Sequence, residues 1–317
     1  MSMNYIRDIK HSASGATAKI HDYGATLMSY KSEGGRECLF MSRDAKTDAS
    51  KAIRGGIPLV FPQFGRPDTS MPQHGFLRVS FWTVDESSLY DHPESAGITY
   101  TLDLKDVTNA RGGPWAVDTT EYDCKLAYHI KIDGKSFTTD LEIQNTGSVS
   151  FPFQTLQHTY YAVDDKSALD PTQCNVTGLA GYTVSDKISM TKYVHDEKND
   201  PIIIDGEVDR VYSPPLSPSP SSSTKDVNVV VGVGGGNAMK VSATGTVDGE
   251  KAEVSCVVWN PHIEKAIGMS DFGNDQYHEM ICVEPGLLNR DTLLAPGKKA
   301  KLTVVSELQQ SHSQSAS

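Results

Sequence analysis

The sequence has few of the residues that build metal and disulfide sites. It contains five cysteines, an odd number, and no two of them are spaced as in a CxxC pair. Neither a His-x-His pair nor an HExxH motif occurs, so we expect no metal site. Cys124, Cys256 and Cys282 lie in alternating apolar runs, where a reduced thiol packs as a small hydrophobic side chain. This pattern favours a reducing compartment, and we expect a cytoplasmic protein.

Long apolar runs and positive charge are also scarce. Residues 1–10 contain no apolar run typical of a signal peptide, and no stretch approaches the length of a membrane span. Lysine and arginine number 29 against 40 aspartates and glutamates, which gives a formal net charge of −11. A nucleic-acid-binding face needs clustered cations, so we expect neither nucleic-acid nor membrane binding. The net negative charge of the chain would repel an anionic small molecule, so such a ligand would need arginines close to its binding site.

The chain shows β-type alternation in many segments and helical periodicity in almost none. Residues 122–132 and 137–143 alternate around a turn at 133–135 and predict a hairpin. Residues 45–53 are the one early segment that could form a brief helix. Many strands joined by short turns predict an all-β fold, a large antiparallel β sandwich.

We expect a single domain over residues 1–317. Residues 213–224 are rich in proline and serine and are expected to form a flexible insertion, since strand patterning resumes on both sides. The polar residues 309–317 are expected to form a frayed tail. No coiled-coil pattern or obvious apolar stripe is visible, so a monomer is the expected state.

One strand-like stretch carries a carboxylate at its end. Residues 280–284 alternate, which places Cys282 and Glu284 on the same face. Pro285 and Gly286 are expected to end the strand, so that Glu284 would occupy its last ordered position. A carboxylate held by a sheet and open to a ligand suits a general base, although an isolated strand-end glutamate is more often only solvated.

A second strand-like stretch carries an imidazole. Residues 151–162 predict a strand or strand pair, in which Gln154, His158 and Tyr160 would share one face. Such a mixture of polar and aromatic groups is typical of a sugar-binding surface rather than a core. Histidine titrates near neutrality, so it can donate and accept a proton. Most histidines have structural roles, and the catalytic interpretation of His158 depends on its meeting Glu284.

Two arginines flank a loop rich in proline and glycine. Residues 54–66 contain two prolines and three glycines, which predicts a buried loop without a regular element. Arg54 opens this loop and Arg78 follows it, and two guanidinium groups there would form an anion clamp. Taken singly, each arginine is more often a solvated surface charge. Asp209 could bind a sugar hydroxyl or pair with a lysine.

Six blocks that occur in order resemble one known family, the hexose-6-phosphate mutarotases (glucose-6-phosphate 1-epimerases), a branch of the aldose 1-epimerase superfamily. The blocks are Arg54–Gly65 (RGGIPLVFPQFG), His74–Arg78 (HGFLR), Gln157–Tyr160 (QHTY), Glu207–Tyr212 (EVDRVY), Val257–Pro261 (VVWNP) and Ile281–Gly286 (ICVEPG). The resemblance runs from the first strands to residue 308. The combination of six blocks is specific, whereas a single block is not.

The resemblance implies a galactose-mutarotase-like super-sandwich that uses neither a metal nor an organic cofactor. It implies interconversion of the α and β anomers of a hexose 6-phosphate, with Glu284 as the base and His158 as the acid. The substrate-binding residues that it implies are Arg54, Gln73, Arg78 and Asp209. The insertion at 213–224 is longer than the family pattern, which leaves Asp205 as an alternative to Asp209.

Three other functions remain open from the sequence. An aldose 1-epimerase acting on unphosphorylated sugars would use the same acid and base. A non-catalytic carbohydrate-binding module would bind sugar without exchanging its anomers. A glycosidase would need two carboxylates across the scissile bond, for which Asp209 and Glu284 are the candidate pair.

Overall fold

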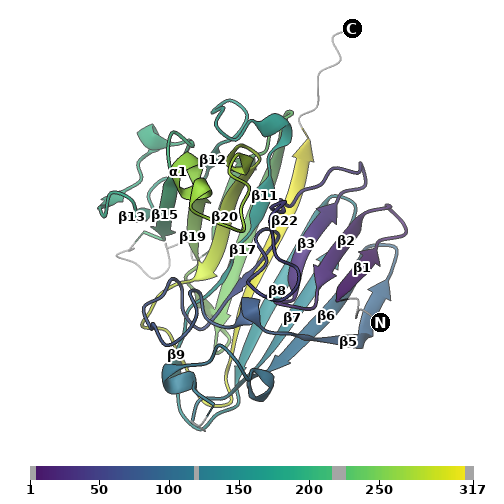
Figure 1. Cartoon of the computed structure of the whole chain (residues 1–317), viewed down its shortest axis with the longest axis vertical. Helices are drawn as coiled ribbons and strands as arrows, with labels where there is room; N and C mark the ends of the chain where they lie inside the picture. The colour runs from purple at the N-terminus through teal and green to yellow at the C-terminus, as the bar shows by residue number, and fades with distance from the viewer. Residues whose placement is uncertain (1–4, 118–120, 216–225, 311–317) are drawn as a thin grey trace.

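A computed structural model describes residues 5–117, 121–215 and 226–310. Within these residues the strand pairs are antiparallel and the helices are short (Figure 1). Two large sheets dominate, which confirms the predicted antiparallel β fold. No helix in the described part of the chain is long and apolar enough to cross a membrane.

The first large sheet has nine strands. In spatial order they are β12 (Val176–Thr177), β16 (Val227–Gly232), β17 (Asn237–Val247), β22 (Lys299–Gln310), β8 (Ser136–Asn145), β7 (Cys124–Ile132), β6 (Ala96–Asp103) and β5 (Thr83–Asp91), with β18 (Glu250–Ala252) beside β17. The predicted hairpin is confirmed as β7 and β8. Its turn is fixed by the Asp133 carboxylate, which accepts hydrogen bonds from the backbone N–H groups of Lys135 and Ser136.

The second large sheet has eight strands and carries the site described below. In spatial order they are β14 (Lys192–Val194), β13 (Thr183–Asp186), β15 (Val208–Ser213), β19 (Ser255–Asn260), β20 (Met280–Leu287), β10 (Thr155–Gln157) and β4 (Leu59–Val60), with β11 (Tyr160–Ala162) also paired to β20. The predicted strand or strand pair at 151–162 is therefore divided into separate short strands.

The remaining elements are small. Two further sheets contain β1 (Ile6–Lys10), β2 (Thr17–His21) and β3 (Thr26–Lys31), and β21 (Leu293–Leu294) with β9 (Phe151–Pro152). In the described part of the chain the α-helix is α1 (His262–Ile267), and the 3-10 helices are Leu77–Val79, Leu104–Asp106, Gly113–Trp115, Asp164–Lys166, Glu197–Asn199 and Gln276–His278. In Figure 1, α1 and the β1–β2–β3 sheet lie on opposite sides of the view.

The main core lies between the two large sheets. Tyr128, Leu141 and Leu302 occupy one row across β7, β8 and β22, and all three are buried in the main apolar cluster. Val258 and Val283 reach the same cluster from the eight-stranded sheet. Each such side chain contributes about 1.5–3 kcal/mol through burial, so the sandwich provides a rigid support for the strands that it contains.

The expected helix at 45–53 is wrong, because this segment has no helical residues. The Asp48 carboxylate accepts hydrogen bonds from both the backbone N–H and the hydroxyl of Ser50, and Ala49 has a left-handed φ of 63°. Side-chain bonds of this kind give the backbone an alternative to helical hydrogen bonds. The segment is instead irregular, with a bend at residues 48–51.

The expected end of the strand at Glu284 is also wrong. β20 continues through Pro285 and Gly286 to Leu287. Pro285 pairs with Cys256 of β19, whereas the ladder from β10 stops one residue away, at Gly286. Proline is tolerated here because it lies where the ladder on one side is interrupted.

Two predicted flexible segments lie largely outside the described residues. Ser213 ends β15, and the part of the predicted insertion from residue 216 onwards is not described. Gln309 and Gln310 of the predicted tail belong to β22, where they pair with Ala238 and Asn237. The rest of the tail, residues 311–317, lies outside the described residues.

Candidate active site

The face of the eight-stranded sheet turned away from the main core carries Glu284. Successive residues of β20 alternate between two apolar clusters. Ile281 and Val283 join the main core, whereas Met280 and Cys282 join a second cluster on the opposite face. Glu284 continues the same alternation and therefore lies on the face of the second cluster. Its side chain is 1% exposed, so it is a buried mid-strand residue.

His158 occupies the position that faces Glu284 on the neighbouring strands. β10 pairs Leu156 with Gly286, and β11 resumes pairing with β20 at Tyr160 with the same offset. This register places His158 directly opposite Glu284, in the gap between the two short strands. Side chains at such facing positions are the closest neighbours across a sheet.

The two side chains are in contact. Nδ1 of His158 lies 3.1 Å from Oε1 of Glu284, and the imidazole is 9% exposed. The pair is not aligned as a hydrogen bond, because Nδ1 of His158 and Oε2 of Glu284 are buried with no hydrogen-bond partner among the described residues. Unsatisfied buried polar atoms are rare in folded proteins, and here they mark the place where a polar ligand would complete the bonding.

Burial shifts the two pKa values in opposite directions. It lowers the pKa of His158 well below its usual range, and the positive charges of Arg78 and Arg54 lower it further. It raises the pKa of Glu284 well above its usual range, assisted by the charge of Asp209 and opposed by Arg78. Burial therefore favours the neutral form of each group and moves the two pKa values towards each other. Groups perturbed in this way are typical of acid–base sites.

The arginine loop runs beside His158 and is buried as predicted. The His158 N–H donates to the Pro58 carbonyl oxygen at 3.0 Å, and the Tyr160 N–H donates to that of Gly56 at 2.9 Å. Gly56 has a φ of 61°, and a Cβ there would lie 2.2 Å from the Leu27 carbonyl oxygen, so only glycine fits. One regular element was not expected here: Leu59–Val60 forms the short strand β4.

Both predicted cationic residues are fixed by hydrogen bonds. Arg54 donates through Nη1 to the Tyr160 hydroxyl at 3.1 Å and through Nη2 to the two carboxylate oxygens of Asp271 at 3.2 and 3.3 Å. Arg78 donates through Nη2 to the Gln73 carbonyl oxygen at 2.7 Å. Burial, with the charge of Arg54, lowers the pKa of Arg78 to about 10, so it stays protonated at neutral pH.

One cavity of about 480 Å³ brings the predicted site residues together. Its lining contains all six of them, namely Arg54, Gln73, Arg78, His158, Asp209 and Glu284. The alternative residue Asp205 is exposed and is not part of this lining. A cavity of this size holds a small ligand such as a monosaccharide derivative. The position of each residue is therefore known, while its role stays a prediction.

Several lining residues were missed by the sequence analysis. His74 is buried, has a φ of 68°, and places its ring 5.8 Å from that of His158. The His74-Gly75 dipeptide was the available signal, since the two left-handed residues make a sharp turn. Lys187 and Lys265 also line the cavity. They come from segments without a local pattern, so only the folded chain shows that they meet.

A cluster of potential metal ligands occurs at the same place. The side-chain donor atoms of His158, Cys282 and Glu284 lie within 4.8 Å of one another. Burial raises the pKa of the Cys282 thiol well above its usual range, and a protonated thiol is a poor ligand. All five cysteines are free and buried, as expected of small hydrophobic side chains. The expected absence of a metal stays a prediction.

The arrangement suits proton transfer at two oxygens of one carbon. An acid and a base in contact can serve both the hydroxyl oxygen and the ring oxygen of a hemiacetal, which are bonded to the same carbon. Positive charges at the edge of the same cavity suit a ligand with a separate anionic group. A non-catalytic sugar-binding surface would not need the perturbed pair.

Comparison with known proteins gives a consistent result. The aldose 1-epimerase family model matches residues 8–306. A relative from Cenchrus ciliaris, named "Putative glucose-6-phosphate 1-epimerase", is 31% identical over 289 residues, covering 90% of this chain and 80% of the relative.

Solved structures agree on the fold. A "putative mutarotase" from Salmonella typhimurium has a TM-score of 0.68 at 22% identity, covering 92% of this chain and 88% of its own. A "galactose mutarotase related enzyme" from Lactobacillus acidophilus has a TM-score of 0.65 at 14% identity, covering 96% and 98%. The fold is therefore galactose-mutarotase-like, as the sequence predicted. This chain belongs to the aldose 1-epimerase family.

Proposed function

We propose that the protein is a glucose-6-phosphate 1-epimerase, which interconverts the α and β anomers of hexose 6-phosphates. One observation carries the proposal: a single cavity holds the His158–Glu284 contact together with the guanidinium groups of Arg54 and Arg78. The name of the Cenchrus ciliaris relative supports the same substrate. The two arginines are the feature of the site that would favour a phosphorylated substrate over a free sugar.

The reaction needs one base and one acid. Glu284 takes the proton of the C1 hydroxyl while protonated His158 gives its proton to the ring oxygen, so the C1–O bond to the ring oxygen breaks and a carbonyl forms. Rotation about the C1–C2 bond presents the other face of the carbonyl. Ring closure then returns one proton from the new hydroxyl to His158 and one from Glu284 to the carbonyl oxygen. The cycle leaves the enzyme unchanged and consumes no other reactant.

The phosphate would assist His158 electrostatically. Arg78 and Arg54 are the charged groups that lower the pKa of His158 after burial. A phosphate monoester carries nearly two negative charges above pH 7, and its binding between the arginines would offset their field. The imidazole would then hold a proton more readily, which the acid step requires. Substrate binding and activation of the acid would thus be coupled.

The remaining predicted residues would position the sugar. Asp209 is half-buried in the cavity lining, where a carboxylate can accept hydrogen bonds from sugar hydroxyls. Gln73 lines the cavity next to Arg78, and its amide can donate as well as accept. Trp259 offers an apolar ring surface against which a pyranose can pack.

Two substrates separate the proposal from the free-sugar alternative. Anomer exchange of glucose 6-phosphate and of glucose is measured by NMR exchange spectroscopy, with the uncatalysed rate subtracted. Arg54→Ala is expected to lower kcat/KM for glucose 6-phosphate by about 10- to 100-fold, because a charge-assisted hydrogen bond is lost. The same variant is expected to change kcat/KM for glucose far less.

Arg66→Ala is the matched control. Arg66 ends the same loop, is exposed, donates to the Thr69 carbonyl oxygen, and is not part of the cavity lining. This variant should behave as the wild type with both substrates. Equal losses with both sugars in Arg54→Ala would favour an aldose 1-epimerase for unphosphorylated sugars. Absence of any acceleration by the wild-type protein would reject the proposed function.

A further inference from the structure

A second cavity lies next to the first and shares its arginines. It has a volume of about 370 Å³ and is built from three segments, 51–58, 72–79 and 268–271, together with Tyr160. Arg54, Gln73 and Arg78 line both cavities, so the two guanidinium groups lie at the boundary between the cavities. His158 and Glu284 line only the first cavity. The arginines can therefore bind an anionic group from either side.

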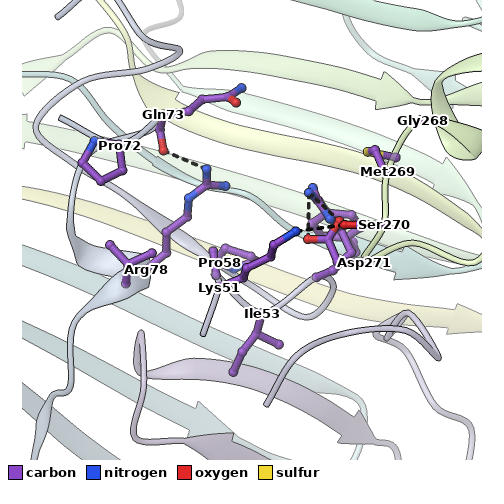
Figure 2. A pocket seen from close by; sticks show the side chains of 14 residues that line it. Lys51, Ile53, Pro58, Pro72, Gln73, Arg78, Gly268, Met269, Ser270 and Asp271 are labelled. Atoms are coloured by element: carbon purple, nitrogen blue, oxygen red, sulfur yellow. Dashed lines mark hydrogen bonds and ion pairs between the residues drawn. The ribbon is translucent and has the colours of Figure 1, made fainter. Parts of the chain in front are cut away.

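Lys51 and Ser270 line the second cavity but not the first. Lys51 donates through Nζ to the Ser270 hydroxyl at 2.9 Å, and both residues are exposed. Figure 2 shows Lys51 reaching Ser270 on one side of the pocket, while Arg78 reaches the backbone of Gln73 on the other side. The hydrogen bond to Ser270 fixes the direction of a side chain that is otherwise flexible.

The charge of the second cavity matches a phosphate dianion. Its charged lining residues are three cations, Lys51, Arg54 and Arg78, and one carboxylate, Asp271, which leaves a net charge of +2. A phosphate monoester above pH 7 carries nearly two negative charges. This local excess is notable on a chain with a formal net charge of −11. A cation cluster on an acidic protein is expected to have a specific anionic ligand.

Hydrogen-bonding capacity is available as well. The Nε atoms of Arg54 and Arg78 are buried and have no hydrogen-bond partner within the described residues. The Lys51 ammonium has three donors, and only one is needed for Ser270. The Ser270 hydroxyl can itself donate while it accepts from Lys51. Phosphate oxygens are acceptors that could satisfy these donors together.

We propose that the second cavity is the subsite for the phosphoryl group, and that Lys51 and Ser270 complete its binding beside the two arginines. This inference rests on the proposed function. The sugar ring would occupy the first cavity against His158 and Glu284, and the phosphoryl group would pass between Arg54 and Arg78. Lys51 is then a residue that determines specificity for a phosphorylated substrate, without a part in the chemical step.

The test compares Lys51→Ala, Lys51→Arg and the control Lys46→Ala. Lys46 is an exposed lysine of the same segment and is not part of either lining. KM and kcat are measured for glucose 6-phosphate and for glucose, and inorganic phosphate is titrated as a competitive inhibitor of glucose 6-phosphate exchange. Lys51→Ala is expected to raise KM for glucose 6-phosphate by about five-fold, with kcat nearly unchanged.

Further results are expected from the same series and from the additional variant Ser270→Ala. Lys51→Ala should leave KM for glucose at the wild-type value and weaken inhibition by inorganic phosphate by a similar factor of about five. Lys51→Arg should restore most of the binding, because the positive charge is kept. Ser270→Ala should raise KM for glucose 6-phosphate by a smaller factor, since it removes one donor and frees Lys51.

Two results would overturn the inference. One is a KM for glucose 6-phosphate in Lys51→Ala that equals the value of Lys46→Ala. The other is an equal loss with glucose and glucose 6-phosphate, which would indicate a structural role of Lys51. Either result can occur while the wild-type protein exchanges glucose 6-phosphate rapidly, so failure of this inference is distinguishable from failure of the proposed function.

Discussion

Nδ1 of His158 and Oε1 of Glu284 lie 3.1 Å apart across a gap in a sheet whose register continues on both sides. The gap interrupts regular strand pairing, although the Thr159 carbonyl oxygen still accepts a hydrogen bond from the Val283 N–H at 3.2 Å. The Thr159 N–H turns back to the Gln157 carbonyl oxygen at 2.9 Å, and the His158 N–H is used by Pro58. The sheet therefore fixes both side chains while leaving the space between their strands free of regular pairing.

The pH dependence should differ between phosphorylated and free sugars. His158 must be protonated to act as the acid, so activity falls as pH rises through its pKa. Arg78 and Arg54 lower that pKa, and a bound phosphate offsets their charge. The fall in kcat is therefore expected at higher pH with glucose 6-phosphate than with glucose.

This difference is measured as kcat for both sugars from about pH 4 to about pH 8, because the pKa of His158 is lowered well below the ordinary histidine value of about 6.5. The ratio of kcat for glucose 6-phosphate to kcat for glucose should increase with pH. Identical profiles for the two sugars would contradict an electrostatic effect of the phosphate on His158.

Asp209→Asn should alter both sugar binding and the pH profile. The charge of Asp209 is the second cause, after burial, of the raised pKa of Glu284. Asparagine keeps the shape and removes the charge, so the pKa of Glu284 should fall. The rise of kcat/KM with pH, where Glu284 loses its proton, should then occur at lower pH. Loss of a hydrogen bond to the sugar should also lower the maximum of kcat/KM by about three- to ten-fold.

The control for this variant is Asp205→Asn, because Asp205 is exposed and outside the cavity lining. It should leave the pH profile of kcat/KM unchanged. A lowered maximum in Asp209→Asn with no displacement of the profile would show that Asp209 acts on the sugar alone.

Glu284→Gln should stabilise the fold increasingly as pH rises. The folded pKa of Glu284 is raised, so the folded state binds this proton more tightly than the unfolded state. The associated stability is present at low pH and is lost as pH rises from the ordinary glutamate pKa, about 4.3, towards the raised value. Glutamine cannot ionise, and the variant avoids this loss.

The measurement is the melting temperature of both proteins between pH 5 and pH 8, with Glu264→Gln on the exposed face of α1 as the control. The difference between Glu284→Gln and the wild type should widen with pH, and the control should show no such trend. A difference independent of pH would mean that Glu284 is already ionised in the folded protein throughout this range, which would contradict its raised pKa.

Local alternation was sufficient to predict the side-chain faces near the site. The period of two in residues 280–284 placed Cys282 and Glu284 together, and the structure gives Cys282 to the second apolar cluster on that face. The glycine and proline content of the arginine loop likewise predicted its burial. The face of a strand on which a side chain lies, and the burial of this loop, depend on residues that are close in the sequence. A local sequence pattern is therefore enough to predict them.

Register and long-range contacts were not available from the sequence. The facing positions of His158 and Glu284 depend on pairing between strands that are remote in the chain. The contact between Arg54 and Asp271 joins two loops without a shared pattern. The continuation of β20 through Pro285 also depends on where the β10 ladder stops, which no rule about proline alone can supply.

The most direct measurement is anomer exchange of glucose 6-phosphate by NMR for the wild type, His158→Ala, Glu284→Gln and the double variant. Each single variant should reduce kcat by about 100-fold or more, and the double variant should lose little beyond the worse single one, because acid and base act in one step. Circular dichroism establishes that each variant is folded. Wild-type exchange rates in both single variants would contradict the account.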